Sequence, residues 1–466
     1  MSGASHGSAG DRPVDTTTTA TLHHRIRSAD AACDLLALAA ARPSRYPFLL
    51  ESSAGAAAQS RFDLLLAFPG ETITADDSDG DFFAALDVAL AAEHSDGVPG
   101  LPFIGGWFVY LGYETAATVE PRLSLPPSPV SALPDAFAVR CPAAILRDRR
   151  DDRLHLLAEP GHGDCIAAMQ ADLDAAADRP APAADTLAAD WQEADPAAYI
   201  AQVAAARDYI HAGDIFQANL SRAWHGRLRQ PSAPATVQAA LRAANPAPFS
   251  GLIQWRGEAL ACSSPERLLL VDDGVAQTRP IAGTRPRTPG SDDLMTRELL
   301  DHPKERAEHV MLIDLERNDL GRVCEPGSIR VDELMVAESY AHVHHIVSNI
   351  RGHMRAGVGP GAVLRAVFPG GTITGCPKVR CMEIIAELEG EGRGAYTGAF
   401  GYLSRCGRLD TNIVIRSLSM RERELTLRTG AGIVADSVPE QELEETRIKA
   451  RGVLRSFRDA DGVPYG

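Results

Sequence analysis

The chain has 466 residues, 45% of them hydrophobic, so it can bury a large core and form two or three domains. Its 62 acidic side chains outnumber its 46 Lys and Arg side chains, which gives a formal net charge of −16. This acidity argues against nucleic acid or an anionic membrane as a partner. No apolar run reaches the length of about 18 residues that a membrane-spanning helix needs. The eight scattered cysteines are typical of free thiols in a reducing compartment, so we expect a cytoplasmic protein.

The chain begins with a segment unlike the rest. Residues 1–20 are rich in Ser, Gly, Ala and Thr and lack an apolar core, which predicts a disordered tail rather than a signal peptide. Proline-rich stretches at 123–134 and 179–185 interrupt regular structure. The second predicts a boundary between an N-terminal region, 21–185, and a C-terminal catalytic region, 190–460.

The C-terminal region mixes two kinds of pattern. Alternating or β-branched segments predict strands at 252–255, 399–403, 412–418 and 425–428. Proline-free segments with helical periodicity predict helices at 197–212, 306–314 and 440–457. The mixture predicts an α+β fold with antiparallel sheets and helices packed outside.

A glycine-rich segment at 368–378 nearly matches a phosphate-binding loop. Gly370 and Gly375 have the P-loop spacing, but Cys376 and Pro377 follow them and the lysine comes two residues late. Pro377 also removes an amide that a phosphate cradle would use. We therefore expect this segment to hold a carboxylate substrate rather than a nucleotide.

Acidic side chains on two predicted helices are candidate metal ligands. Glu308 lies on a helix that is apolar around most of its circumference, so we expect burial and a partner for its charge. That partner is either a core arginine or a metal ion. Glu442, Glu445 and Lys449 lie at i, i+3 and i+7 and share a face, while Leu443, Ala450 and Leu454 lie elsewhere on the helix and form its predicted core stripe. The face is either a solvated acidic surface or, with Glu308, a Mg²⁺ site.

Two further patterns indicate polar groups among apolar neighbours. Arg416 lies inside the predicted strand 412–418, where it would form an internal ion pair or bind a carboxylate with both ends of its guanidinium. In the run 340–348, taken as a strand, His345 faces one side while His342 and His344 face the other. Each histidine is either a satisfied core residue or a general acid or base.

Four long motifs occur together in order and carry a family resemblance. They are 279–287, 306–322, 368–378, and 432–436 with the acidic helix that follows; a further signature stands at 48–52. The chain resembles the chorismate-utilising enzymes, which include anthranilate synthase component I, aminodeoxychorismate synthase component I, and isochorismate and salicylate synthases. The resemblance implies a two-sheet sandwich with helices outside and Mg²⁺-dependent replacement of a chorismate hydroxyl.

The resemblance also implies a role for each matched position. Catalytic roles fall on His345, Thr372, Gln217 and Glu266. Substrate contacts fall on Arg416, Tyr396, Gly432, Lys449, Ala282, Gly283 and Thr284. The Mg²⁺ ligands are Glu308 and Glu445, with Glu442 in support. A candidate tryptophan pocket lies at Leu50, Glu51 and Ser52, and because residues 245–250 depart from the regulated type we expect no strong feedback.

The nucleophile is predicted from Gln217, because water-using relatives carry a lysine base there and an amide cannot deprotonate water. Ammonia is therefore expected. The motifs disagree on which ring carbon is aminated. Ala282 matches anthranilate synthases, whereas 245–250 and 368–375 match aminodeoxychorismate synthases. Taken together the motifs favour aminodeoxychorismate synthase component I, which makes 4-amino-4-deoxychorismate for p-aminobenzoate and folate. Anthranilate synthase component I, with amination at C2 and loss of pyruvate, is the alternative.

Partners follow from what the chain lacks. No cysteine stands in a glutaminase nucleophile turn, so we expect ammonia to come from a separate glutamine amidotransferase subunit. Chorismate is the expected substrate, and Mg²⁺ the expected cofactor.

Overall fold

The computed structural model describes residues 22–29, 34–53, 61–76, 81–129, 133–176, 182–183, 187–287, 297–298, 303–339 and 343–465. The predicted tail at 1–20, most of the predicted boundary at 179–185, and His342 lie outside these residues. No helix among the described residues is long and apolar enough to cross a membrane.

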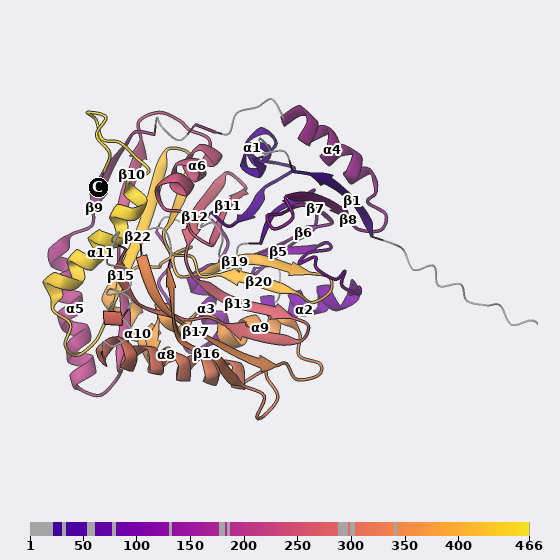
Figure 1. Ribbon diagram of the computed structural model, residues 1–466. Helices are drawn as coiled ribbons and strands as arrows, with labels where there is room; N and C mark the ends of the chain where they lie inside the picture. The colour runs from indigo at the N-terminus through magenta and orange to yellow at the C-terminus, as the bar shows by residue number, and fades with distance from the viewer. Residues whose placement is uncertain are drawn as a thin grey trace, which may run out of the picture.

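Two antiparallel sheets form the framework, as predicted (Figure 1). Within the described residues the first sheet has 12 strands. In spatial order they are β1 (His23–Ser28), β8 (Arg153–Ala158), β7 (Ala143–Asp148), β3 (Phe62–Ala67), β2 (Phe48–Glu51), β11 (Phe249–Trp255), β12 (Glu258–Ser264), β21 (Ser417–Arg421), β22 (Glu424–Ile433), β10 (Gln217–Leu228) and β18 (Gly375–Cys376), with β9 (Ala189–Glu193) also paired to β10.

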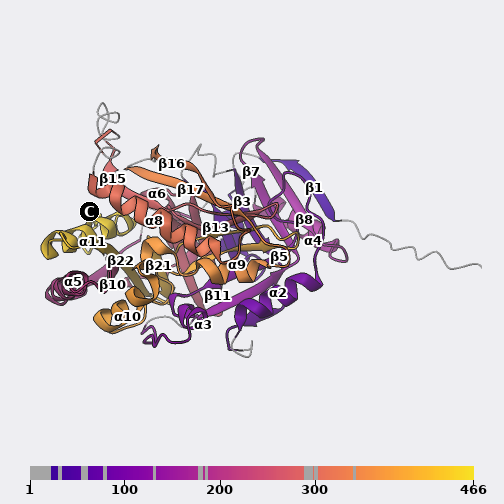
Figure 2. The ribbon, with the colours of Figure 1, turned by 90° about the horizontal axis from the view of Figure 1, so that it is seen from below.

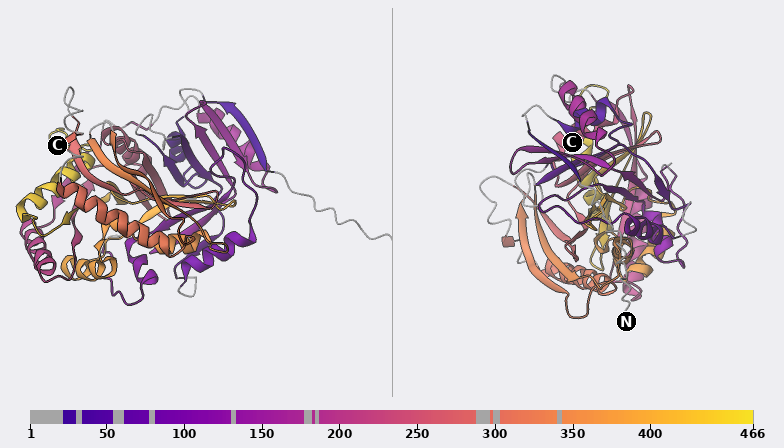
Figure 3. Two further views of the ribbon diagram at one scale, coloured as in Figure 1. Left: turned by 60° about the horizontal axis from the view of Figure 1, so that its bottom comes forward. Right: turned by 90° about the vertical axis from the view of Figure 1, so that its right-hand side faces the viewer.

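The second sheet has 10 strands among the described residues. They are β15 (Ile281–Pro286), β17 (Val343–His353), β14 (Val275–Thr278), β13 (Arg267–Asp272), β20 (Leu409–Asn412), β19 (Ala399–Ser404), β5 (Gly106–Leu111), β6 (Ala136–Cys141) and β4 (Thr72–Thr74), with β16 (Arg330–Ser339) also paired to β17. Figure 3 shows the long β16–β17 pair beside helix α8 (Pro303–Gly321).

Both sheets contain strands from both of the regions predicted from sequence. In the first sheet, β2 pairs with β11; in the second, β5 pairs with β19. The ring of Phe48 on β2 stacks on Phe108 of β5, with centroids 3.8 Å apart, so the aromatic core between the sheets also joins them. The chain from 48 onward therefore folds around shared cores rather than around a core for each region.

Helices cover the outer faces of the sandwich. Alternation along β5 shows this: Phe108 and Tyr110 face the core between the sheets, whereas Val109 and Leu111 face a second core shared with α2, α8 and α9. The remaining helices are α1 (Leu35–Ala41), α2 (Phe82–Ala92), α3 (Ala116–Val119), α4 (Asp164–Ala176), α5 (Pro196–His211), α6 (Pro234–Ala244), α9 (Pro360–Val367), α10 (Lys378–Glu389) and α11 (Pro439–Leu454), with short 3₁₀ turns η1 (Tyr113–Thr115) and η2 (Gly371–Ile373). Helices α5, α10 and α11 gather at one end of the molecule and α4 lies at the other (Figures 1 and 2).

Candidate active site

The floor of the candidate site is the pairing of β10 with β22. Asn219 lies directly opposite Gly432, and Ser221 opposite Gly430, so both glycines share a face with the side chains of Gln217 and Asn219. A Cβ on Gly432 would lie 2.5 Å from Gln217 Nε2, and a Cβ on Gly430 would lie 2.8 Å from Asn219 Oδ1. The glycines therefore leave the space that two amide side chains enter.

Helix α8 brings Glu308 to the same place. Gln217 Nε2 donates a hydrogen bond of 3.0 Å to Glu308 Oε1, and the same oxygen would lie 3.6 Å from a Cβ on Gly432. The sequence predicted this helix as buried around most of its circumference, and that is only partly correct. Arg306, Val310 and Asp314 are exposed, so one face is solvated while Glu308 is half-buried.

A β-bulge on the second sheet positions His345. Ala282 pairs with Ile346 and Thr284 with His345, so Gly283 is the extra residue, with φ +65°. The Gly283 carbonyl lies 3.2 Å from His345 Nδ1. Since a carbonyl only accepts, Nδ1 carries the proton and Nε2 is the basic nitrogen of the neutral ring. Burial lowers the pKa of His345 to about 4, so the ring is neutral at physiological pH.

A buried carboxyl stands beside the glycine-rich segment. Glu266, in the turn from β12 to β13, is almost fully buried, and neither its Oε1 nor Thr372 Oγ1 makes a hydrogen bond of ordinary geometry within the described residues. Burial raises the pKa of Glu266 to about 7, and the charge of Glu316 on α8 adds to the effect. Glu266 can therefore hold a proton near neutral pH.

The glycine-rich segment itself is tied to α8 by ion pairing. Lys378 Nζ lies 2.5 Å from Asp319 Oδ2 and donates to the carbonyl of Val367. The lysine that resembled a displaced P-loop lysine is thus a structural cation. It anchors the segment that carries Thr372 in η2.

Helix α11 supplies the remaining charged groups. Lys449 Nζ lies 2.7 Å from Glu445 Oε1 and donates to the Gly430 carbonyl at 2.9 Å, which attaches the helix to β22. Glu442 is buried, whereas Glu445 is about half exposed. The predicted core stripe of this helix, Leu443, Ala450 and Leu454, is confirmed as buried.

Arg416 is not inside a strand, and that prediction is wrong. The segment 412–418 divides into the end of β20 and the start of β21, which belong to different sheets, and Arg416 lies in the crossing between them with φ +52°. Within the described residues its guanidinium makes no hydrogen bond or ion pair. Burial lowers the pKa of Arg416, whereas Tyr396 and Glu445 raise it. Because the guanidinium has no partner of its own among the described residues, an anionic ligand would find an unpaired cation.

Arg393 was missed by the sequence reasoning, although Glu389 precedes it at helical spacing. The two side chains are each 1% exposed and lie 2.6 Å apart. Arg393 also donates to the carbonyls of Ile373 and Asn219 and lies over the ring of Tyr396. It therefore joins η2, β10 and Tyr396 into one frame. Burial raises the pKa of Tyr396 to about 12, which keeps its hydroxyl protonated.

Unpaired buried polar atoms mark this site as built for a polar ligand. Within the described residues, atoms with no hydrogen-bond partner include Gln217 Oε1 and Asn219 Oδ1. Such atoms are rare in folded proteins because burial without a partner costs free energy. A cavity of about 280 Å³ lies elsewhere, around Glu114, Pro127 and Asp135. A small space of about 10 Å³ borders Tyr396 and Arg393.

The predicted Mg²⁺ ligands are oxygen donors from two helices, which is the chemistry Mg²⁺ prefers. Among the described residues no three acidic, histidine or cysteine side chains are close enough to form a metal site on their own. Glu308 accepts from Gln217, and Glu445 pairs with Lys449. The donor set therefore fits a cation that also takes oxygens from a bound anion and from water.

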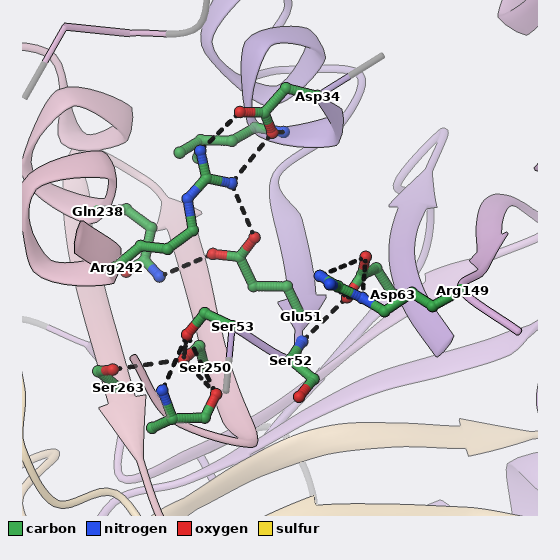
Figure 4. Close-up of polar contacts among 12 residues, drawn as sticks. Asp34, Glu51, Ser52, Ser53, Asp63, Arg149, Gln238, Arg242, Ser250 and Ser263 are labelled. Carbon is green, nitrogen blue, oxygen red and sulfur yellow. Dashed lines mark hydrogen bonds and ion pairs between the residues drawn. The ribbon is translucent and has the colours of Figure 1, made fainter. Parts of the chain in front are cut away.

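The candidate tryptophan pocket is a separate polar cluster (Figure 4). Glu51 accepts from Gln238 at 3.1 Å and pairs with Arg242 at 3.2 Å, and Arg242 also pairs with Asp34. Leu50 packs beside the core between the sheets, and the Ser52 amide donates to Asp63. Burial raises the pKa of Glu51.

Known proteins resemble this chain over most of its length. Residues 45–455 match the family described as chorismate binding enzyme. The chain belongs to this family. Anthranilate synthase component 1 of Streptomyces coelicolor is 39% identical over 90% of this chain and 85% of its own length. Anthranilate synthase component 1 of Pseudomonas aeruginosa is 41% identical over 78% of this chain and 77% of its own.

Solved structures agree on the fold of this chorismate-binding enzyme. A crystal structure of anthranilate synthase component I from Streptococcus pneumoniae is 29% identical, with a TM-score of 0.76 over 85% of this chain and 93% of that one. The menaquinone-specific isochorismate synthase from Escherichia coli is 19% identical, with a TM-score of 0.71 over 93% of this chain and 94% of that one, which shows the fold alone.

The prediction of aminodeoxychorismate synthase component I is wrong. The relatives at 39–41% identity over most of the chain, and the structure from Streptococcus pneumoniae, are named anthranilate synthase component I. The structure explains why two motifs misled. Ser250, from 245–250, bonds to Ser53 beside the Glu51 cluster (Figure 4), and a Cβ on Gly370 would meet Ile413 at 2.9 Å. Ser250 and Gly370 therefore report packing, whereas Ala282 lies on β15 beside Gly283 and His345.

Proposed function

We propose that this chain is component I of an anthranilate synthase. Its reaction is chorismate plus ammonia giving anthranilate, pyruvate and water. The observation that carries the proposal is the identity of 39–41% to proteins named anthranilate synthase component 1 over more than three quarters of the chain. Ala282 supports it, because alanine offers no amine for a covalent adduct and so favours direct addition at C2.

Binding of a dicarboxylate is assigned to the cations and donors around Gly432. Arg416, which has no partner in the described residues, takes one carboxylate with its planar fork. Lys449 donates to the Gly430 carbonyl, and the Tyr396 hydroxyl stands beside Gly430, so both lie at the strand that carries the Gly432 amide. Contacts between these cations and donors and the two carboxylates of the substrate orient the ring before reaction.

Two protonation states suit the two proton transfers that the reaction needs. Glu266 retains a proton near neutral pH because of its raised pKa, and we assign it as the acid that protonates the departing 4-hydroxyl. His345 is neutral with Nε2 basic, and we assign it to remove the C2 proton when the enolpyruvyl group leaves. Loss of that proton makes the ring aromatic.

A bound Mg²⁺ would neutralise the ring carboxylate and stabilise the negative charge that develops there. Glu308 and Glu445 are the residues we assign to hold it, with Glu442 in support. A glutamine amidotransferase subunit is the proposed source of ammonia.

Product analysis tests the proposal. Purified chain with chorismate, Mg²⁺ and ammonium at alkaline pH is expected to form fluorescent anthranilate and an equal amount of pyruvate. An aminated product that yields p-aminobenzoate only after a lyase is added, with no anthranilate, would overturn the proposal.

A further inference from the structure

Two side-chain carbonyl oxygens on one strand face lack partners. Gln217 Oε1 and Asn219 Oδ1 are buried and make no hydrogen bond within the described residues. The two residues are two apart on β10, so their side chains project to the same side of the sheet. A pair of unsatisfied acceptors in one place indicates a ligand with two donor hydrogens.

Neighbouring groups fix how both amides lie. Glu308 can only accept, so Gln217 must turn Nε2 toward it, and Oε1 then points away. Gly430 makes room for Asn219 Oδ1, since a Cβ there would lie 2.8 Å from that oxygen. The Asn219 backbone is held as well: its N–H donates to Thr374 and its carbonyl accepts from the buried Arg393.

We propose that Gln217 Oε1 and Asn219 Oδ1 together bind ammonia, each accepting one of its N–H groups. The inference rests on the proposed amination and deepens it by assigning a nucleophile site. The Cα atoms of same-face neighbours on a strand lie roughly 7 Å apart, and the side chains of Gln217 and Asn219 are long enough to bring their oxygens to the roughly 5 Å that two N–H···O contacts of about 3 Å to one nitrogen require. The nitrogen lone pair then points away from both oxygens.

The acceptor pair suits the course of the bond-forming step. The nitrogen lone pair forms the C2–N bond, the two ring double bonds shift from C1=C2 and C5=C6 to C1=C6 and C4=C5, and the C4–O bond breaks as the leaving hydroxyl takes a proton from Glu266. The nitrogen becomes positively charged as its bond forms, so its N–H groups bind the two carbonyls more strongly in the transition state than before it. The added nitrogen then loses one proton to solvent.

The same pair discriminates against water as a nucleophile. Water can donate to both carbonyls, but it must also lose a proton as it attacks, and neither amide is a base. Ammonia attacks as the neutral molecule and needs no prior deprotonation. Asn219 is therefore a residue for binding the nucleophile rather than chorismate.

Steady-state kinetics of the full chain test this site. Asn219→Leu keeps a similar shape without an acceptor, whereas Asn219→Asp keeps the acceptor. We expect Asn219→Leu to raise the KM for ammonium at least about 10-fold while the KM for chorismate stays within about twofold. Asn219→Asp should recover most of the loss. Gln254→Leu on β11, whose amide donates to the Ala39 carbonyl, is the control and should change neither constant.

A rise in the chorismate KM with an unchanged ammonium KM would overturn the proposal, as would no change in either. If Asn219→Leu fails to fold, Asn219→Ser gives the same comparison. The wild-type product separates the two proposals: a product other than anthranilate would refute the proposed function, whereas the ammonium KM would still report on the acceptor pair.

Discussion

Gln217 Nε2 and Glu308 Oε1 lie 3.0 Å apart, and this hydrogen bond joins β10 to α8 where the proposed nucleophile and metal positions adjoin. A group placed at position 217 is therefore beside a carboxylate. An amide there donates to the carboxylate without gaining or losing a proton.

Gln217→Lys should change the nucleophile. A lysine beside Glu308 supplies a group that can act as a general base toward water, and it removes the carbonyl Oε1. We expect ammonium-dependent formation of anthranilate to fall at least about 100-fold and isochorismate to appear in chromatographic product analysis. Gln217→Leu, which removes the amide without adding a base, is the matched control and should form neither product at an appreciable rate. Unchanged anthranilate formation in Gln217→Lys would contradict the role given to the amide.

Arg416 should be specific for chorismate binding. Arg416→Lys keeps the charge but loses the planar fork, so we expect the KM for chorismate to rise about 10–100-fold with a smaller effect on kcat. Arg421→Lys on β21 is the control, because Arg421 is exposed and pairs with Glu258 away from the site. The KM of Arg421→Lys for chorismate should stay within about twofold of the wild-type value. Equal effects of the two substitutions on KM would show that Arg416 does not bind the substrate.

The candidate site could be predicted from sequence only at positions where the residue type itself indicates the chemistry. Glu308 was predicted from a carboxylate on a mostly apolar helix, and Glu445 and Lys449 from a shared helix face, and α8 and α11 confirmed the helices on which they lie. Arg416 was assigned to a strand because apolar and β-branched neighbours surround it. A positive φ and a crossing between sheets are not visible in the sequence when the residue is not glycine, so the local pattern could not indicate them.

Asn219 and Arg393 needed the fold. An unpaired amide oxygen is visible only once β10 lies against Gly430 and Gly432, which are more than 200 positions later in the chain. The pairing of β2 with β11, and of β5 with β19, likewise depends on contacts between distant segments, which no local pattern reports.

Arg393 should be essential for stability. Arg393→Met leaves Glu389 buried with only Arg428 to balance it, so we expect the free energy of unfolding to fall by about 3–5 kcal/mol in urea titrations. The control is Arg451→Met, which removes an ion pair with Glu444 in which both side chains are over 40% exposed. That change should cost less than about 1 kcal/mol. A similar cost for both substitutions would contradict the frame assigned to Arg393.

Glu266 should couple stability to pH. Its pKa is about 7 in the folded chain and near 4.5 when unfolded, so between these values the unfolded chain loses a proton that the folded chain keeps. Stability from this group is therefore fully present below pH 4.5 and falls by roughly 3 kcal/mol as pH rises to 7. Glu266→Gln should remove that part of the decline, and kcat should fall about 100-fold or more. Parallel stability curves for wild type and variant between pH 4.5 and 7.5 would exclude the raised pKa.

Glu445 should affect the metal and not the fold. Glu445→Gln removes a carboxylate charge while keeping its shape, so we expect Mg²⁺-dependent turnover to fall at least about 100-fold and calorimetric Mg²⁺ binding in the presence of chorismate to weaken. The lost pairing with Lys449 is partly exposed, so the stability change should stay below about 1 kcal/mol. Glu440→Gln, at the exposed start of α11, is the control and should retain both turnover and Mg²⁺ binding. Loss of turnover in Glu445→Gln with unchanged Mg²⁺ binding would assign Glu445 to holding Lys449 in place, and the metal ligand would then have to be sought at Glu442.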